Sequence, residues 1–290
     1  MDSDWGVDVT LPKNNNQERT IIMKNLGFIG TGNIGSAIIG GVLKTGLVEP
    51  AQVIAADVNM AQLTPIIQNY GIHAASNIEV AQQSDVLFLC LKPAIFDTVI
   101  NQIREHIRPG AIIVSVAAGM SIATIEAKFN LNPAPKIARV MPNIPAVVGC
   151  AMTAICTTPI FSSEETDWLV QIFNSFGLAE ILPEHQFDAF TAIASSSPAY
   201  AFMFIEALAD AGVKHGLSRA QALRFSTQAV LGAAQMLKDT GGHPALLKDA
   251  VCTPGGTTIE AVCELEKQGF KNTVISSVNV CVQKSMEMRD

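Results

Sequence analysis

Residues 27–41 read GFIGTGNIGSAIIGG, and Gly30, Gly32 and Gly35 follow the spacing G-x-G-x-x-G. The apolar run before them predicts a strand, and the segment after them predicts a helix. In a dinucleotide-binding fold the first glycine permits a tight turn, the second admits the pyrophosphate, and the third lets helix and strand pack closely. The helix N-terminus then offers free N–H groups to the phosphates. An ordinary glycine-rich turn also fits this stretch, so its meaning depends on the segments around it.

Short apolar runs alternate with helical segments up to about residue 183. We expect strands at Leu26–Ile29, Val53–Ala56, Val86–Leu91, Ile112–Val116, Lys136–Val140, Ala151–Cys156 and Ala179–Leu182. We expect helices at Ile34–Lys44, Met60–Tyr70 and Ile95–His106, and one more capped by Ser162 or Ser163. Strands spaced by helices predict a parallel sheet covered on both faces.

The chain after residue 183 has no strand-like run. It is rich in Ala, Leu, Met and Phe at helical spacing, and glycines and prolines divide it into several helices. We therefore predict an α/β fold in which a Rossmann-type dinucleotide-binding domain is followed by an all-helical domain. The expected parts are a disordered leader (1–22), the Rossmann domain (23–184) and the helical dimerisation and substrate domain (185–290).

The composition limits the partners of this chain. Apolar residues make up 49% of its 290 residues and charged residues 16%, which predicts that much of the surface faces another subunit. A net charge of −7 without clustered Lys and Arg argues against a nucleic-acid partner. We expect no membrane span, because the most apolar stretch, 198–213, carries Glu206 and Asp210 and falls short of a bilayer's thickness. The first residues lack the pattern of a signal peptide, so we expect a cytoplasmic protein. The cysteines and histidines show no metal-binding spacing, so we expect no metal site.

Asp57 ends the second expected strand, where an acidic residue binds the ribose 2′-hydroxyl of NAD and repels the 2′-phosphate of NADP. No arginine follows it in residues 57–63, DVNMAQL, although Asn59 offers a hydrogen-bond donor. A solvated strand-end carboxylate is equally consistent with the pattern, so the choice between NADH and NADPH stays open on these residues. Asn143, held between two prolines after a later strand, either positions a nicotinamide amide or lies in a stiff turn.

Residues 253–258, TPGGTT, precede a helix expected at 259–268 and form a second anion-binding loop. Their N–H groups and three hydroxyls can hold a carboxylate without an arginine. A capping loop explains part of the pattern, but two glycines and three threonines exceed what one cap requires. No nucleophile elbow, zinc-protease motif or Ser/His/Asp set is recognisable, so a bound cofactor is expected to carry the reaction.

Taken together, these segments closely resemble the pyrroline-5-carboxylate reductase family. The matching stretches are 27–41, 91–93 (LKP), 115–119 (SVAAG), 139–146 (RVMPNIPA), 196–213 and 246–270. The resemblance runs from about residue 24 to the C-terminus, and its Pro-Gly-Gly-x-Thr segment is the most specific part. It implies hydride transfer from NADPH, with NADH as the alternative, to the C=N carbon of Δ1-pyrroline-5-carboxylate, which gives L-proline. It also implies homodimers with interleaved helices, an active site shared between one subunit's nucleotide domain and its partner's helices, and further assembly into decamers.

The resemblance assigns roles to single residues. The hydroxyl of Thr258 should act as the catalytic group near the ring nitrogen of the substrate. The residues that hold the substrate carboxylate should be Thr253, Gly256, Thr257 and Thr258. Together with the residues derived above, the cofactor site should comprise Gly30, Thr31, Gly32, Asn33, Ile34, Gly35, Asp57, Asn59, Asn77, Leu91, Lys92, Pro93, Ala117, Ala118 and Asn143. A protonated imine accepts hydride readily, so no strong general acid is required.

Three residues depart from the family pattern. Thr253 stands in place of a usual serine and keeps the hydroxyl, whereas Ser195 replaces a usual glycine and should narrow the loop near the substrate. Ile144 replaces a usual threonine and removes a polar contact to the cofactor. Two other functions stay open on the sequence: a related imine or β-hydroxyacid reductase, and a nucleotide-binding regulatory protein that has lost turnover.

Overall fold

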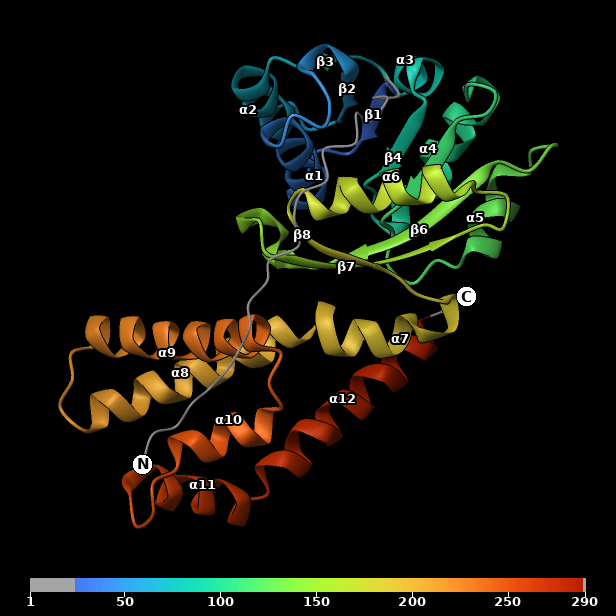
Figure 1. Cartoon of the computed structure of the whole chain (residues 1–290). Coiled ribbons are helices and arrows are strands. Elements are labelled where there is room, and N and C mark those ends of the chain that lie inside the picture. Colours follow the sequence, from blue (N-terminus) through green and yellow to red (C-terminus); the bar gives the residue numbers. More distant parts are fainter. Residues whose placement is uncertain (1–23, 289–290) are drawn as a thin grey trace.

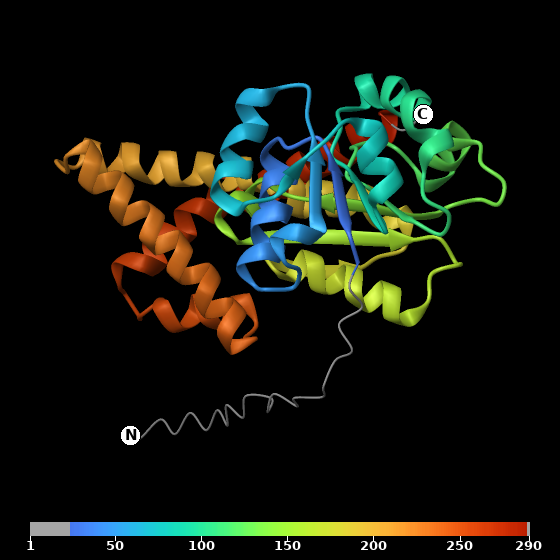
Figure 2. The ribbon, with the colours of Figure 1, turned by 90° about the horizontal axis from the view of Figure 1, so that it is seen from above.

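The computed structural model describes residues 24–288, so the leader expected at 1–22 lies outside the described residues. Residues up to about 183 form one sheet with helices on both faces, and the remaining residues form a separate helical lobe (Figures 1 and 2). The predicted order, an α/β domain followed by an all-helical domain, is confirmed. The predicted boundary between residues 184 and 185 stays a prediction.

The sheet has eight strands in the order β3-β2-β1-β4-β5-β6-β7-β8. They are β1 (Leu26–Ile29), β2 (Val53–Ala56), β3 (His73–Ala74), β4 (Val86–Leu89), β5 (Ile112–Ser115), β6 (Lys136–Pro142), β7 (Ala151–Thr157) and β8 (Gly177–Ile181). Strands β1 to β6 are parallel, but β7 is antiparallel to β6 and β8 is parallel to β7. The parallel sheet predicted for strands spaced by helices is confirmed, whereas the sequence predicted no direction for β7 and β8. Only residues 143–150 connect β6 to β7, and such a short connection cannot make the crossover that a parallel strand needs.

Helices cover both faces of this sheet. They are α1 (Asn33–Lys44), α2 (Met60–Tyr70), α3 (Asn77–Gln83), α4 (Pro93–Ile103), α5 (Ile122–Phe129) and α6 (Ser163–Asn174). The sequence pattern missed α3, α5 and β3, which are only 7, 8 and 2 residues long. Ser162 caps α6: its hydroxyl accepts from the N–H of Glu165, whose carboxylate accepts from the N–H of Ser162. Ser76 and Glu79 form the same capping box at α3, a signal that the sequence already contained.

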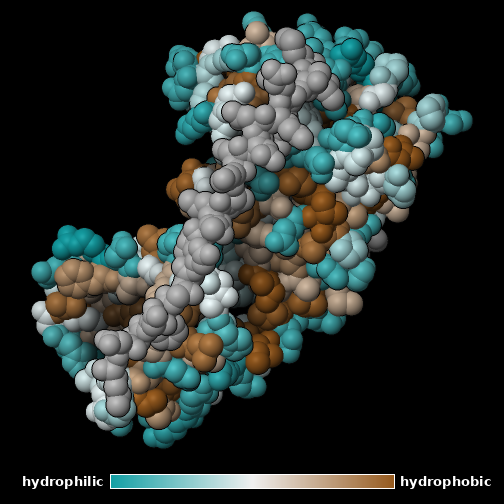
Figure 3. Space-filling model, in the orientation of Figure 1, coloured by the Kyte–Doolittle hydropathy of each residue, from teal (hydrophilic) through white to brown (hydrophobic). Residues whose placement is uncertain are grey.

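The helical domain exposes much apolar surface. It consists of the 3₁₀-helix η4 (Glu184–Gln186), α7 (Phe187–Phe190), the π-helix η5 (Thr191–Ser195), α8 (Ser197–Lys214), α9 (Arg219–Thr240), α10 (Pro244–Val251), α11 (Thr257–Lys267) and α12 (Phe270–Glu287). Large apolar side chains on α8 to α12 are exposed, among them Phe202, Met203, Leu246, Ile275 and Val280. Figure 3 shows such apolar side chains as brown patches on the helical lobe. A surface of this kind indicates that the domain packs against another protein surface.

One continuous helical stretch, Glu184–Lys214, is long and apolar enough to cross a membrane by length and composition. The sequence prediction concerned residues 198–213 alone, and in the structure they belong to this longer helical stretch, because η4, α7 and η5 precede α8. Length and composition alone are weak evidence for a span, and the predicted absence of a membrane partner stays a prediction.

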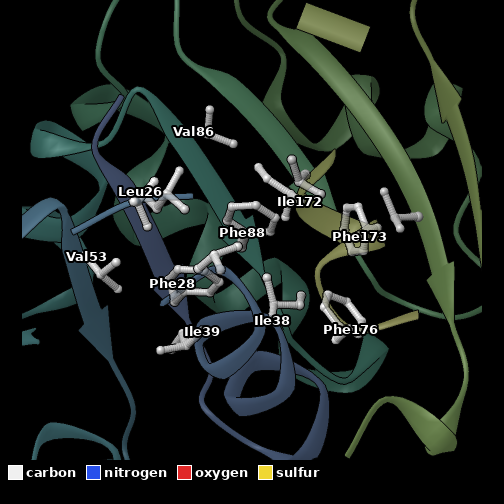
Figure 4. Packing of buried hydrophobic residues seen from close by; sticks show 14 of the residues in the cluster. Leu26, Phe28, Ile38, Ile39, Val53, Val86, Phe88, Ile172, Phe173 and Phe176 are labelled. Atoms are coloured by element: carbon white, nitrogen blue, oxygen red, sulfur yellow. The ribbon is translucent and has the colours of Figure 1, made fainter. Parts of the chain in front are cut away.

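An aromatic layer fixes α1 and α6 on the sheet (Figure 4). Phe28 of β1 stacks on Phe88 of β4 with ring centroids 4.6 Å apart, and Phe173 of α6 meets Phe88 edge-on at 6.3 Å. These three side chains and Ile38 of α1 are fully buried. A second apolar cluster lies on the other face of the strands, as expected of a sheet covered on both sides. The loops that follow β1, β2, β4 and β5 therefore start from a rigid base.

Candidate active site

The glycine-rich loop lies between β1 and α1, where β1 has β2 on one side and β4 on the other. This is the point at which an open α/β sheet forms its ligand crevice. Gly30 has a φ of +97°, and a Cβ at this position would clash with the carbonyl oxygen of Cys90. A Cβ at Gly35 would clash with the carbonyl oxygen of Gly30. Two of the glycines are thus required because β1, β4 and α1 approach closely.

Gly32 has open space above it. A Cβ there would meet only Oε1 of Gln62, at 3.9 Å. Gly32 is also the N-cap of α1, and no side chain caps this helix. The first N–H groups of α1 therefore remain for a ligand. An anionic group such as a pyrophosphate fits this cradle.

A crevice of about 460 Å³ opens in front of the loop. The predicted cofactor residues that line it are Gly30, Gly32, Asn33, Asp57, Asn59, Asn77, Leu91 and Lys92. Among the described residues that line the crevice, Lys92 is the only Lys or Arg, and Asp57 is the only acidic residue. The space, the free N–H groups and the mixed lining fit the adenosine diphosphate half of a dinucleotide.

Asp57 fastens the glycine loop to the end of β2. Its Oδ2 accepts hydrogen bonds from the N–H of Thr31 at 2.6 Å and from Oγ1 of Thr31 at 2.9 Å. Its Oδ1 accepts from the N–H of Asn59 at 2.8 Å, and Oδ1 of Asn59 caps α2 through the N–H of Ala61. Sequence reasoning assigned Asp57 to the ribose and missed this second role, because the partner lies 26 residues away.

The other predicted cofactor residues lie outside this crevice. They are Thr31, Ile34, Gly35, Pro93, Ala117, Ala118 and Asn143. Ala118 lines a second cavity, of about 250 Å³, between the loop after β5 and α12. The side chain of Asn143 is buried, and both ends of its amide are hydrogen-bonded within the protein. The contacts predicted between these residues and a cofactor stay predictions.

The TPGGTT loop joins α10 to α11 in the helical domain. α11 begins at Thr257, two residues earlier than the sequence predicted, with Gly256 as an N-cap that lacks a side-chain bond. The N–H of Gly256 donates to the carbonyl of Thr253 at 3.0 Å, and Gly255 has a φ of +66°. The first N–H groups of α11 are therefore free beside the hydroxyls of Thr257 and Thr258, as an anion site requires.

The two halves of the predicted site do not meet within one chain. None of the residues of the TPGGTT loop lines the crevice at the glycine loop. Figures 1 and 2 show α10 and α11 in the part of the helical lobe that lies away from the sheet. Within the described residues of one chain, the TPGGTT loop and the crevice thus lie apart.

Cys90 borders the crevice but is not a nucleophile. Burial raises the pKa of its thiol to about 12, so the sulfur is protonated and unreactive near neutral pH. Within residues 24–288, no group of three or more His, Cys, Asp or Glu side chains is placed to hold a metal ion. The chemistry of this crevice thus depends on what it binds.

Comparison with known proteins identifies the family. The model for pyrroline-5-carboxylate reductase dimerisation matches residues 184–288, and the model for NADP oxidoreductase, coenzyme F420-dependent, matches residues 25–119. The pyrroline-5-carboxylate reductase of Escherichia coli (strain K12) is 42% identical over 266 residues, which are 91% of this chain and 98% of that protein. The chain belongs to the pyrroline-5-carboxylate reductase family. The resemblance seen in the sequence is thereby confirmed.

Solved structures of pyrroline-5-carboxylate reductases have the same fold. The enzyme from Coxiella burnetii is 27% identical, with a TM-score of 0.87, over 92% of this chain and 99% of that one. The Plasmodium falciparum enzyme, solved with NADP bound, is 31% identical, with a TM-score of 0.81, over 92% and 98% of the two chains. The chain is thus an oxidoreductase of this family, and its exposed apolar helices fall within the part matched by the dimerisation model.

Proposed function

We propose that this protein reduces Δ1-pyrroline-5-carboxylate to L-proline with NADPH, with NADH as the alternative, in the last step of proline biosynthesis. The observation that carries the proposal is the presence of two anion cradles on one chain of this family. One lies over Gly32 beside the crevice and the other lies at the N-terminus of α11. The first suits a pyrophosphate and the second suits the carboxylate of a small substrate.

The nucleotide domain would bind and orient the cofactor. The N–H groups at the start of α1 would hold the diphosphate, and Asp57 and Asn59 would border the adenosine ribose. The proposed cofactor residues are those named from the sequence, from Gly30 to Ala118, whereas the amide of Asn143 is bonded within the protein. When bound, the dihydronicotinamide supplies a hydride, which is two electrons and one hydrogen nucleus, to the C=N carbon, while the ring nitrogen takes up a proton.

The helical domain would hold the substrate. The N–H groups of the α11 N-terminus and the hydroxyls of Thr253 and Thr257 would bind its carboxylate, next to Gly256. The hydroxyl of Thr258 would lie against the ring nitrogen and form a hydrogen bond with it. Fixing the imine carbon against the cofactor supplies most of the catalysis, because the protonated imine is already a good hydride acceptor.

We also propose that each active site combines the crevice of one subunit with the TPGGTT loop of its partner. The exposed apolar faces of α8 to α12 support such a homodimer. On this view the apolar stretch Glu184–Lys214 is a subunit contact rather than a membrane span. Assembly into decamers, a cytoplasmic location and the absence of nucleic-acid or membrane partners are part of the same proposal.

The direct test is substrate-dependent oxidation of NADPH by the purified protein. Thr258→Ala should lower turnover about 100-fold while the Kd of the cofactor stays nearly unchanged. Thr240→Ala, at the end of α9, is the matched control and should leave turnover intact. Full activity in Thr258→Ala would show that the role given to this hydroxyl is wrong.

Other outcomes separate the alternatives. Turnover with other cyclic imines but not with Δ1-pyrroline-5-carboxylate would indicate a related reductase, and cofactor binding without turnover would indicate a regulatory protein.

The shared site can be tested with mixed dimers of Thr258→Ala and a Gly32→Glu variant. Because half of the dimers are mixed and each holds one intact site, activity should return to about a quarter of the wild-type value.

A further inference from the structure

The side chain of Asn143 connects the two domains. Asn143 follows β6, at the carboxyl end of a parallel strand, and is 8% exposed. Its Oδ1 accepts from the N–H of Met152 in β7 at 3.0 Å. Its Nδ2 donates to the carbonyl of Ala194 in the π-helix at 2.8 Å. A donor on one side and an acceptor on the other fix the orientation of this amide.

The carbonyl of Ala194 needs a partner from outside its own helix. In an α-helix it would accept from the residue four positions later, but that residue is Pro198, which has no N–H. The local bonding is of the π type, since the N–H of Ser196 reaches the carbonyl of Thr191 at 2.8 Å. The side-chain N–H of Asn143 supplies the donor that the helix lacks here, and removing a donor from a partly buried carbonyl is costly.

A second brace holds the same strand to the start of the helical domain. Oε1 of Glu184 accepts from Nη1 of Arg139 in β6 at 3.0 Å and from the N–H of Ile122 at 2.8 Å. The buried guanidinium of Arg139 also lies over the ring of Phe187, 4.5 Å from its centroid. Strand β6 is therefore fixed twice to the segment that leads into α8, which gives the helical domain a defined orientation.

We propose that Asn143 is a positioning residue for hydride transfer. By holding Ala194 it would set the orientation of the helical domain relative to the carboxyl ends of the parallel strands, where the nicotinamide end of the cofactor would lie. The inference rests on the proposed function, in which the helical domain of one subunit brings its TPGGTT loop to the crevice of the partner, so the orientation of that domain sets where the loop lies. The amide oxygen and one amide hydrogen of Asn143 are already engaged, so the side chain has little capacity left as a ligand of the cofactor. Its loss should therefore affect kcat more than cofactor affinity.

Asn143→Asp tests this role with minimal change of shape. The carboxylate keeps the bond from Met152 but places an oxygen against the carbonyl of Ala194. At neutral pH we expect kcat to fall about 10-fold to 100-fold, because a small misalignment of reactants is enough for such a loss. The Kd of NADPH, measured without the imine, should change by less than about threefold. Protonation of the new carboxyl restores a donor, so the deficit relative to wild type should shrink as the pH falls toward about 5.

Asn174→Asp is the matched control. The exposed side chain of Asn174 accepts from the N–H of Ala179 at 2.8 Å, which a carboxylate does equally well. This variant should keep wild-type kcat at every pH. Pro198→Ala tests the hydrogen bond between Asn143 and Ala194 from the helix side. It gives residue 198 an N–H that competes with Asn143 for the carbonyl of Ala194. It should reproduce the loss of kcat in weaker form, and it decides the question if Asn143→Asp does not fold.

Two results would overturn the proposal. A Kd for NADPH raised about tenfold or more, with unchanged kcat at saturation, would make Asn143 a direct cofactor ligand. An unchanged kcat in both Asn143→Asp and Pro198→Ala would show that Asn143 has no positioning role. Hydrogen exchange of residues 191–200 should become faster in Asn143→Asp. Because this measurement needs no turnover, it tests the joint even if the wild-type protein proves inactive with the proposed substrate.

Discussion

Replacing the loop glycines one at a time by alanine should separate fold stability from cofactor binding. At Gly30, with a φ of +97°, alanine enters the left-handed region at a cost of about 1–2 kcal/mol. Its Cβ also clashes with the backbone carbonyl of Cys90, and overpacking of this kind costs about 1–3 kcal/mol. Gly30→Ala should therefore lower the free energy of unfolding by about 2–5 kcal/mol.

Gly32→Ala should behave differently from its neighbours. Its Cβ has no contact closer than 3.9 Å, so the loss of stability should stay below about 1 kcal/mol. The same methyl group occupies the space that a pyrophosphate would approach, and the Kd of the cofactor should rise about tenfold or more. Gly35→Ala clashes with the carbonyl of Gly30 without a positive φ and should lose about 1–3 kcal/mol.

Urea unfolding at fixed protein concentration and cofactor titration measure the two effects. Gly110→Ala is the control, because its φ is +80° but nothing lies within 4 Å of the added Cβ. It isolates the conformational cost from the clash. If Gly30→Ala is no less stable than Gly110→Ala, the close approach to Cys90 does not constrain the loop. If Gly32→Ala binds the cofactor like the wild type, the pyrophosphate does not lie where we place it.

Three further outcomes follow from charges and thiols. Asp57→Asn removes the negative charge from the crevice and should lower the Kd of NADPH relative to that of NADH about fivefold to tenfold at constant ionic strength; equal shifts for both cofactors would contradict this. Partial burial raises the pKa of Glu165, but the hydrogen bonds from Lys136 and from the helix cap outweigh it and lower the pKa overall. A carboxyl with a lowered pKa stabilises the fold above its unfolded pKa and loses this effect as the pH falls through its folded pKa. Glu165→Gln should thus lower the free energy of unfolding by about 1 kcal/mol near pH 7 and by much less below about pH 4. An equal loss at the two pH values would refute a stabilising role for the ion pair between Glu165 and Lys136. Iodoacetamide near pH 8 should modify the exposed Cys150. It should leave Cys90 unmodified until the protein unfolds, because the pKa of the Cys90 thiol is raised to about 12. Mass spectrometry of the treated protein measures both outcomes.

Local sequence patterns predict the helices and strands whose bounds depend only on neighbouring residues. The bounds of β1, β2 and α2 agree with the prediction residue for residue, because each is a clear apolar or amphipathic run. The reversed direction of β7 depends instead on the length of its connection to β6. The full length of the helix from Glu184 depends on irregular turns that carry no simple period.

The candidate site was predictable where backbone geometry demands special residues. Glycine at positions 30 and 35 and the TPGGTT loop leave a trace in the sequence because few other residues fit. The bonds of Asp57 to Thr31 and of Asn143 to Ala194 span 26 and 51 residues. Polar contacts at such separations have no periodicity, so only the structure shows that both side chains brace the fold.

The exposed helices also determine how the chain must fold. The aromatic layer around Phe88 lets the nucleotide domain bury its own core in a unimolecular step. The helices after residue 196 have few buried residues within one chain. Their final packing is then a bimolecular event whose rate rises with the concentration of finished chains. Until two chains meet, this apolar surface is open to chaperones and to misassembly.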